Sequence, residues 1–257
     1  MSPRPRFILL LACALPALWP LAGNATESAV LAAGAGVQRM PAWPGAKNDR
    51  QDPVPYIDIE LPGVGSFSTL DGLELEFLHG PALRGGLYGG YQWGRERSDL
   101  GALAGKVPSL SPRVNLGGYL EWQVNKAMDV GANLSHDTQG AGAYLNLYVD
   151  TDLPALGPVQ EAATLRWSMM NGAAMNRFFG VGNASASALS VSPWHPSGGS
   201  EMASLEYDLF VPTSHHTGVA LALVYGRLLG GAANSPLVQQ FGTANQWSES
   251  LAFIWHP

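Results

Sequence analysis

The chain has 257 residues, and only 13% of them are charged, about half the share found in an ordinary soluble domain. Its 31 glycines are close to twice the usual frequency. The net charge of −6 and the lack of any Lys/Arg cluster exclude a chain built to bind nucleic acid.

The first 25 residues have the pattern of a cleaved export signal. Arg4 and Arg6 precede the apolar stretch "FILLLACALPALWPLA", and the small residues "GNA" follow it. The apolar stretch is shorter than the roughly 20 residues of a membrane-spanning helix and contains two prolines. We therefore predict a signal peptide over residues 1–25, with cleavage before Thr26, and one exported domain over residues 26–257.

Cys13 raises a lipoprotein alternative, because "LLAC" loosely fits a lipid-attachment site. Few apolar residues precede this cysteine and strongly apolar ones follow it, so a cysteine within a discarded signal is the better interpretation. Residues 26–257 contain no cysteine, which excludes disulfides and thiolate metal sites from the mature chain.

After the signal, apolar residues alternate with small or polar ones. Segments with this period of two include "RVNLGGYLEWQV", "MDVGANLS", "GAYLNLYVD" and "GVALALVYGR". No segment shows a convincing apolar period of 3.6 residues, so the chain is predicted to be all-β. An exported all-β chain is either a secreted sandwich or an outer-membrane barrel.

The composition of the second strand face favours the barrel. This face carries Gly, Ala, Asn, Ser and Tyr rather than the plentiful charge expected of a solvated sheet. Aromatic residues gather towards strand ends, where the headgroup level of a membrane would lie. They are Tyr88, Tyr91, Trp93, Trp122, Trp167, Trp247 and Trp255.

The requirement for an even number of strands gives a predicted count of twelve. We expect strands near 30–39, 53–61, 84–93, 113–124, 128–135, 142–150, 159–170, 200–210, 217–228 and 246–256. Ser66–Glu76 adds a hairpin that turns at Asp71-Gly72, and the count falls to ten if this segment is one bent strand. Even parity places the three long loops, Gly94–Leu110, Asn171–Gly199 and Leu229–Asn245, on the extracellular side.

Candidate catalytic and metal-binding groups are sparse. Ser135, His136 and Asp137 are consecutive in a strand end, so their side chains alternate between faces and cannot form a triad. His215 and His216 are predicted to lie in a periplasmic turn. His195 is assigned to an outer loop and His256 to the terminus, so no metal geometry is expected.

Two further patterns receive structural interpretations. Glu74 and Glu76 share one strand face and are expected to face the lumen, as a structural or solute-facing pair rather than an acid/base pair. Gly180-x-Gly182 lacks a lysine and an expected following helix, so it predicts no phosphate-binding loop. We predict no enzyme activity, no catalytic residue, no metal and no cofactor.

The lumen is expected to contain charges of both signs. The candidates are Arg113, Glu121, Arg166, Glu206 and Asp208. Charges of a single sign would steer a solute through the lumen, whereas charges of both signs favour cross-strand ion pairs that plug the barrel. Plugging is the predicted state, and a narrow diffusion channel is the alternative.

At several places the chain resembles the MltA-interacting protein (MipA/OmpV) family of outer-membrane proteins. "YGRLLGGAANSPLV" and "GTANQWSESLAFIW" are similar to the end of that family. "GGYQWGRERSDLGALAG", "SHDTQGAGAYLNL", "RFFGVGNASASA" and "WPGAKNDRQDPVPYIDIEL" are similar to earlier segments. The chain departs from the pattern by lacking the Asp of the "LLGDAADSP" motif and by ending in Trp255-His256-Pro257.

The resemblance implies an outer-membrane barrel in contact with lipid. It also implies a scaffolding role in which the barrel tethers a lytic transglycosylase to a murein synthase. A passive channel and a surface adhesin acting through Asn171–Gly199 remain as alternatives. The sequence predicts no oligomeric state.

Overall fold

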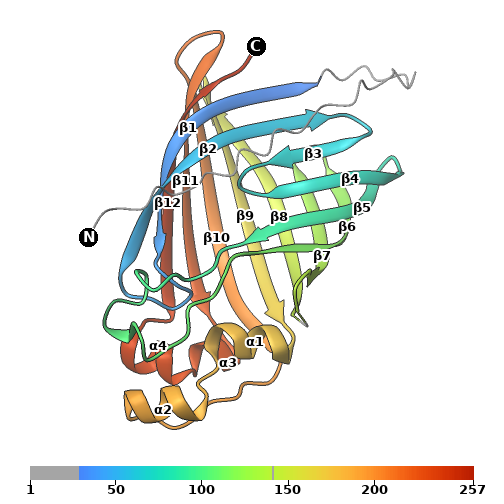
Figure 1. The fold of residues 1–257 in the computed structure, drawn as a ribbon. Coiled ribbons are helices and arrows are strands. Elements are labelled where there is room, and N and C mark those ends of the chain that lie inside the picture. The colour runs from blue at the N-terminus through green and yellow to red at the C-terminus, as the bar shows by residue number, and fades with distance from the viewer. Residues whose placement is uncertain (1–28, 141) are drawn as a thin grey trace.

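A computed structural model describes residues 29–140 and 142–257, so the predicted signal peptide lies outside the described residues. Twelve antiparallel strands form one closed barrel in which each strand pairs with its chain neighbours and β1 pairs with β12 (Figure 1). The strands are β1 (Val30–Pro41), β2 (Asp49–Leu61), β3 (Gly65–Ser68), β4 (Gly72–His79), β5 (Leu83–Gln92), β6 (Arg113–Asn125), β7 (Met128–Asp137), β8 (Ala143–Leu156), β9 (Val159–Met170), β10 (Gly199–Pro212), β11 (Thr217–Leu228) and β12 (Asn245–Trp255).

The predicted count of twelve is confirmed, because the segment 66–76 is a hairpin and not one bent strand. Its turn is one residue longer than predicted: Thr69–Asp71 form the turn, and Ser68 pairs with Gly72. Gly72 has a φ of 102°, and a Cβ there would lie 2.2 Å from the carbonyl oxygen of Gly89. Glycine therefore permits both the turn and the close approach to β5.

This hairpin is much shorter than the other strands and leaves part of β2 without a neighbour. β3 pairs only with residues 58–61 of β2, and the rest of that edge has no strand partner among the described residues. Pro53 and Pro55 lie on the unpaired stretch, where a missing backbone N–H costs no ladder hydrogen bond. Nearby, Arg50 lies 4.9 Å from the ring centre of Trp93 and forms an ion pair with Asp99 at 3.4 Å.

The outward faces of the strands form a broad apolar surface, as the lipid-facing prediction requires. Exposed apolar side chains recur at every second position, for instance at Leu116, Leu120 and Trp122 of β6. Tyr91, Trp93, Trp167, Trp247 and Trp255 are also exposed. Tyr88 is the exception to the predicted aromatic belt, because it lies on the inner face in the middle of β5 and lines the lumen.

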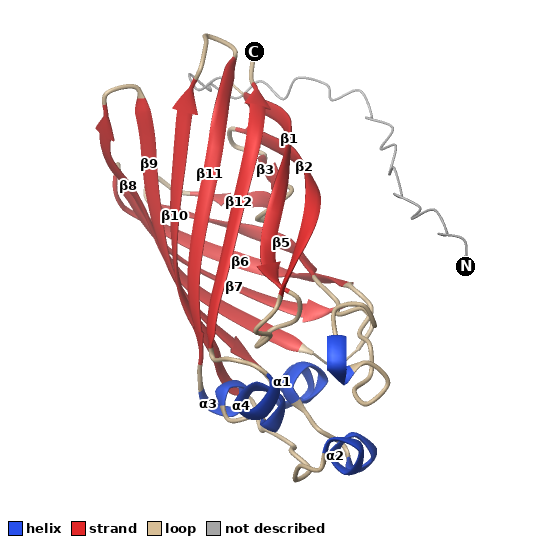
Figure 2. Ribbon diagram, turned by 90° about the vertical axis from the view of Figure 1, so that its left-hand side faces the viewer, coloured by secondary structure: helices blue, strands red, loops and turns tan. Residues whose placement is uncertain are grey.

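Short helices lie in the long loops and were not predicted. They are the 3₁₀ helix η1 (Gly101–Leu103) and the α-helices α1 (Gly172–Phe179), α2 (Asn183–Leu189), α3 (Gly230–Ala233) and α4 (Pro236–Phe241). They gather at the end of the barrel opposite the C-terminus (Figure 2). Among the described residues, no helix has the length and apolarity needed to cross a membrane.

Candidate functional site: a capped, acidic lumen

The helical end of the barrel is closed by a small hydrophobic core, which we call the cap. Four loops contribute to it: those after β1, β5, β9 and β11. Its central side chains are fully buried, including Met175 and Phe179 of α1 and Leu237 of α4. Because these loops are the long ones, the parity rule places the cap on the extracellular side.

Hydrogen bonds tie the four loops of the cap to one another. The Ser235 hydroxyl donates to the carbonyl oxygen of Phe179 at 2.7 Å and accepts from the N–H of Leu237, so it both caps α4 and binds α1. The N–H of Gly45 donates to the side-chain oxygen of Gln246 at 2.8 Å. These contacts join segments that are distant in sequence, and the cap is therefore one unit.

Arg95 is the most completely buried charged side chain of the cap. It is 2% exposed, and its Nη1 donates to the carbonyl oxygen of Phe178 at 2.8 Å. Its Nε donates to the carbonyl oxygen of Pro108 at 3.1 Å. Burial, with repulsion from Arg177, lowers the pKa of Arg95 from the ordinary value of arginine to about 10. Arg95 therefore joins the loop after β5 to the loop after β9.

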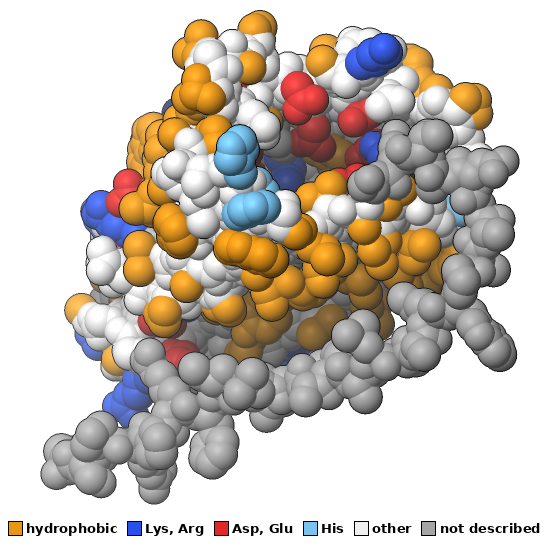
Figure 3. Space-filling model, turned by 90° about the horizontal axis from the view of Figure 1, so that it is seen from above, with side chains coloured by type: hydrophobic (Ala, Val, Ile, Leu, Met, Phe, Trp, Pro, Cys, Tyr) orange, Lys and Arg blue, Asp and Glu red, His pale blue; other side chains and the backbone are white. Residues whose placement is uncertain are grey.

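Beneath the cap, the barrel contains a cavity of about 1120 Å³. Its lining extends along the inner faces of the strands to the end with the short turns, and none of the buried residues of the cap belongs to it. Figure 3 looks into this end, and acidic side chains surround the hollow. The cavity is therefore entered from the side that the parity rule assigns to the periplasm.

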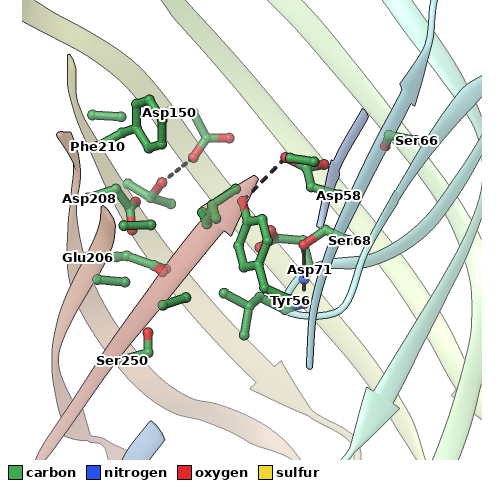
Figure 4. A pocket seen from close by; sticks show the side chains of 18 of the residues that line it. Tyr56, Asp58, Ser66, Ser68, Asp71, Asp150, Glu206, Asp208, Phe210 and Ser250 are labelled. Atoms are coloured by element: carbon green, nitrogen blue, oxygen red, sulfur yellow. Dashed lines mark hydrogen bonds between the residues drawn. The ribbon is translucent and has the colours of Figure 1, made fainter. Parts of the chain in front are cut away.

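Carboxylates dominate the inner wall of this cavity. Figure 4 shows Glu206, Asp208 and Asp150 on one side and Asp58 and Asp71 on the other. The inward-facing acidic residues that line the cavity are Asp58, Asp71, Glu74, Glu121, Asp150, Asp152, Glu206 and Asp208. Arg166 is the one arginine or lysine among the described residues of the lining.

Several of these carboxylates are held by neutral donors. The Thr164 hydroxyl donates to Asp150 at 2.6 Å, and the Tyr148 hydroxyl donates to Glu121 at 3.2 Å. The Tyr56 hydroxyl donates to Asp58 at 3.4 Å. Hydroxyl donors orient a carboxylate without cancelling its charge, whereas Glu121 is also ion-paired with Arg84.

The structure places four of the five charged residues predicted for the lumen in the lining of the cavity. Glu121, Arg166, Glu206 and Asp208 all line the cavity, whereas Arg113 is bound to Asp137 at the capped end. A cross-strand ion pair of the predicted kind joins Arg84 to Glu121. The prediction that such pairs plug the lumen is nevertheless wrong, because a cavity remains inside the barrel. The loops of the cap close the barrel instead.

Four acidic residues of the lining were not predicted from the sequence: Asp58, Asp71, Asp150 and Asp152. Strand parity nevertheless places Asp150 and Asp152 on the same face as Tyr148.

The glutamate pair of β4 lies on the inner face as predicted, but its two members have different surroundings. Glu74 lines the cavity, whereas Glu76 contacts His79 at 3.3 Å near the end of the strand. The pair therefore does not act as one unit in the lumen.

The predicted geometry of Ser135, His136 and Asp137 is confirmed. Ser135 and Asp137 are buried on the inner face, and His136 is exposed on the other. The backbone N–H of His256 donates to the carbonyl oxygen of His216, and His195 lies in the loop after β9. Within the described ranges, no three His, Cys, Asp or Glu side chains converge on a possible metal position.

One sequence interpretation of the loop after β9 is wrong. Gly180-x-Gly182 was expected to lack a following helix, but α2 begins directly after Gly182. The helix has only seven residues. The prediction that Gly180-x-Gly182 is not a phosphate-binding loop now rests on one observation, that no lysine follows the glycines.

Comparison with solved structures finds other outer-membrane proteins at low identity. An outer-membrane channel from Pseudomonas putida F1 has 8% identity and a TM-score of 0.41, covering 93% of this chain and 100% of its own. The toluene transporter TbuX of Ralstonia pickettii has 12% identity and a TM-score of 0.39, covering 90% and 89%. OmpT of Vibrio cholerae has 7% identity and a TM-score of 0.36, covering 90% and 98%.

No curated protein matches the chain. The model of one protein family, described as MltA-interacting protein MipA, matches residues 33–257, which span nearly the whole described barrel. The closed barrel and its apolar outer surface are the architecture of a protein that crosses the outer membrane with strands. The chain belongs to the MipA family and is an outer-membrane β-barrel protein.

Proposed function

We propose that the protein is a non-conducting interaction protein of the cell envelope, whose periplasmic end engages murein-remodelling enzymes. The buried cap carries this proposal, because a barrel whose extracellular end is packed with apolar side chains offers no continuous water path. The family name, MltA-interacting protein, supports a murein enzyme as the partner class. A lytic transglycosylase and a murein synthase are the expected partners.

We also propose that the protein has no enzyme activity. His136 points away from Ser135 and Asp137, and its ring nitrogen contacts the backbone carbonyl oxygen of Asp137 at 2.8 Å. A general base must reach the nucleophile that it activates, and this arrangement separates the two.

A cation channel is the second candidate, because the carboxylate wall favours the entry of cations. Conductance in planar bilayers separates the two functions. We expect no steady current from the wild-type protein and a cation-selective current from Phe179→Asp, since a charge at a fully buried position disrupts the cap. Ala188→Asp adds the same charge on an exposed position of α2 and should stay silent. A steady wild-type current would refute the non-conducting state.

Partner capture tests the second half of the proposal. Folded protein immobilised in detergent should retain an identified lytic transglycosylase from envelope extracts. The Phe179→Asp variant should retain it equally well, because its change lies at the opposite end of the barrel. Failure of the wild-type protein to retain any murein enzyme would contradict the partner assignment.

A further inference from the structure

Two polar side chains in the acidic lumen have a hydrogen-bond donor without a partner among the described residues. Asn133 is 8% exposed and lines the cavity. Its side-chain oxygen accepts from Asn146 at 2.8 Å, but its amide nitrogen has no hydrogen-bond partner among the described residues. The Nε of Arg166 is buried and also lacks a partner there, and no described carboxylate lies within salt-bridge distance of this guanidinium. A buried donor such as the Nε of Arg166 is rarely left unsatisfied in a native protein.

Strand register shows how these donors are placed relative to the carboxylates. Successive inner rows of β8, β9 and β10 are about 7 Å apart, since each step spans two residues of strand. From the cap towards the mouth, the rows read Asn146 and Ser168, then Tyr148, Arg166 and Ser204, then Asp150, Thr164 and Glu206, then Asp152, Ala162 and Asp208. Asn133 of β7 joins the first row. Asn133 and Arg166 therefore lie deeper in the lumen than the carboxylates of β8 and β10, whereas Glu121 of β6 lies in the same row as Arg166.

The order of donors and carboxylates along the lumen specifies the chemistry of a matching ligand. Arginine and amide N–H groups bind a carboxylate, whereas the outer rows bind ammonium groups. The acidic side chains are spread along the wall and do not converge on one metal position. Several amine groups on a flexible chain match such a wall better than a single ion. Tyr56, Tyr88 and Tyr148 also line the cavity and provide aromatic surface for the methylene segments and ammonium groups.

We propose that the lumen binds a small zwitterion with one carboxylate and at least two amine groups, namely a diamino acid or a short basic peptide. Arg166 and Asn133 hold the carboxylate, and Asp150, Glu206 and Asp208 hold the amines. The cavity is large enough for such a ligand, since small-molecule sites commonly occupy about 300–1,000 Å³. The site is separate from the proposed function, because a partner protein can dock on the periplasmic turns without entering the lumen.

Isothermal titration of the folded protein in detergent at low ionic strength tests this site. The probes are lysyl-lysine and its C-terminal amide, which differ only in the carboxylate. We expect the wild-type protein to bind the free acid about ten-fold more tightly than the amide, and Arg166→Gln to lose or reverse this preference. The reversal follows because the amide carries the larger positive charge.

Two further variants separate a built site from general attraction. The double variant Glu206→Gln, Asp208→Asn should weaken both probes by about ten-fold or more. Glu96→Gln removes a carboxylate from the exposed loop after β5 and should change neither. Heat-dependent gel mobility confirms that each variant is folded.

Two results would overturn the inference. If the amide binds the wild-type protein as tightly as the free acid, Arg166 does not hold a carboxylate. If neither probe binds, the lumen is not a site for this class of ligand. Neither result affects the conductance and capture experiments, so the proposed function stands or fails separately.

Discussion

At the scale of single residues, Arg95 joins two loops of the cap through its buried guanidinium. Replacing it with methionine keeps much of the side-chain volume but leaves the carbonyl oxygens of Phe178 and Pro108 without their donor. We expect Arg95→Met to lower the free energy of unfolding by about 2 kcal/mol. Denaturant unfolding of the refolded barrel measures this loss. Arg97→Met, at an exposed position of the same loop, should stay within about 0.5 kcal/mol of the wild type.

The lowered pKa of Arg95 gives this effect a defined pH dependence. The folded state binds the proton less tightly than the unfolded state, so stability would rise with pH only in a window between about pH 10 and the ordinary pKa of arginine. Below that window the group is charged in both states. The difference between the wild type and Arg95→Met should therefore be equal at about pH 6 and about pH 9. A difference that grows across this range would show that another group titrates with Arg95.

Individual residues differ in how well sequence predicts their surroundings. Glu121, Glu206 and Asp208 were assigned to the lumen because strand parity alone decides which face a side chain occupies. Parity also places Arg166 there but does not show that its guanidinium lacks a partner, since this depends on the width of the barrel. Arg95 lies in a loop, where no period relates its position to burial.

At the scale of elements, the β1–β12 seam closes the barrel. Gly36 of β1 faces inward at this seam, and a Cβ there would lie 2.4 Å from the carbonyl oxygen of Leu251. Gly36→Val should force the two strands apart and cost about 1–3 kcal/mol. The temperature at which the folded band disappears on a gel should fall. Ala35→Val, on the exposed face of the same strand, serves as the control. Equal behaviour of the two variants would contradict the close packing of the seam.

Strands were predictable and helices were not, for one physical reason. The strands are mostly 8 to 14 residues long and show several repeats of their period of two. The α-helices have four to eight residues, so an apolar period of 3.6 is repeated about twice at most. Such short helices depend on tertiary packing, which here is the shared core of the cap.

At the scale of the whole molecule, the outer surface must contact acyl chains. Leu165 is 57% exposed near the middle of β9 and pairs with Val149 and Leu205. Leu165→Arg should cost about 2–4 kcal/mol, because an arginine side chain would be placed in the hydrocarbon layer. Folding yield and unfolding in lipid vesicles measure this cost, and Leu165→Met should behave as the wild type. Full tolerance of the arginine would be incompatible with a lipid-facing β9.

The architecture followed from the sequence, whereas the state of the lumen did not. Alternation, parity and loop lengths were sufficient for a twelve-stranded barrel with its long loops on one side. Closure depends on how four loops that are distant in sequence pack together, and alternation along a strand contains no information about that packing. The sequence therefore predicted a plugged barrel but assigned the plug to the wrong residues.

Because the cap covers only one end of the barrel, the two ends of the molecule differ. The end that the parity rule assigns to the exterior of the cell carries the packed cap, so antibodies and phage meet the surface of the folded loops there. The negatively charged interior communicates with the compartment beneath the membrane. Any molecule that occupies this interior therefore enters it from that compartment.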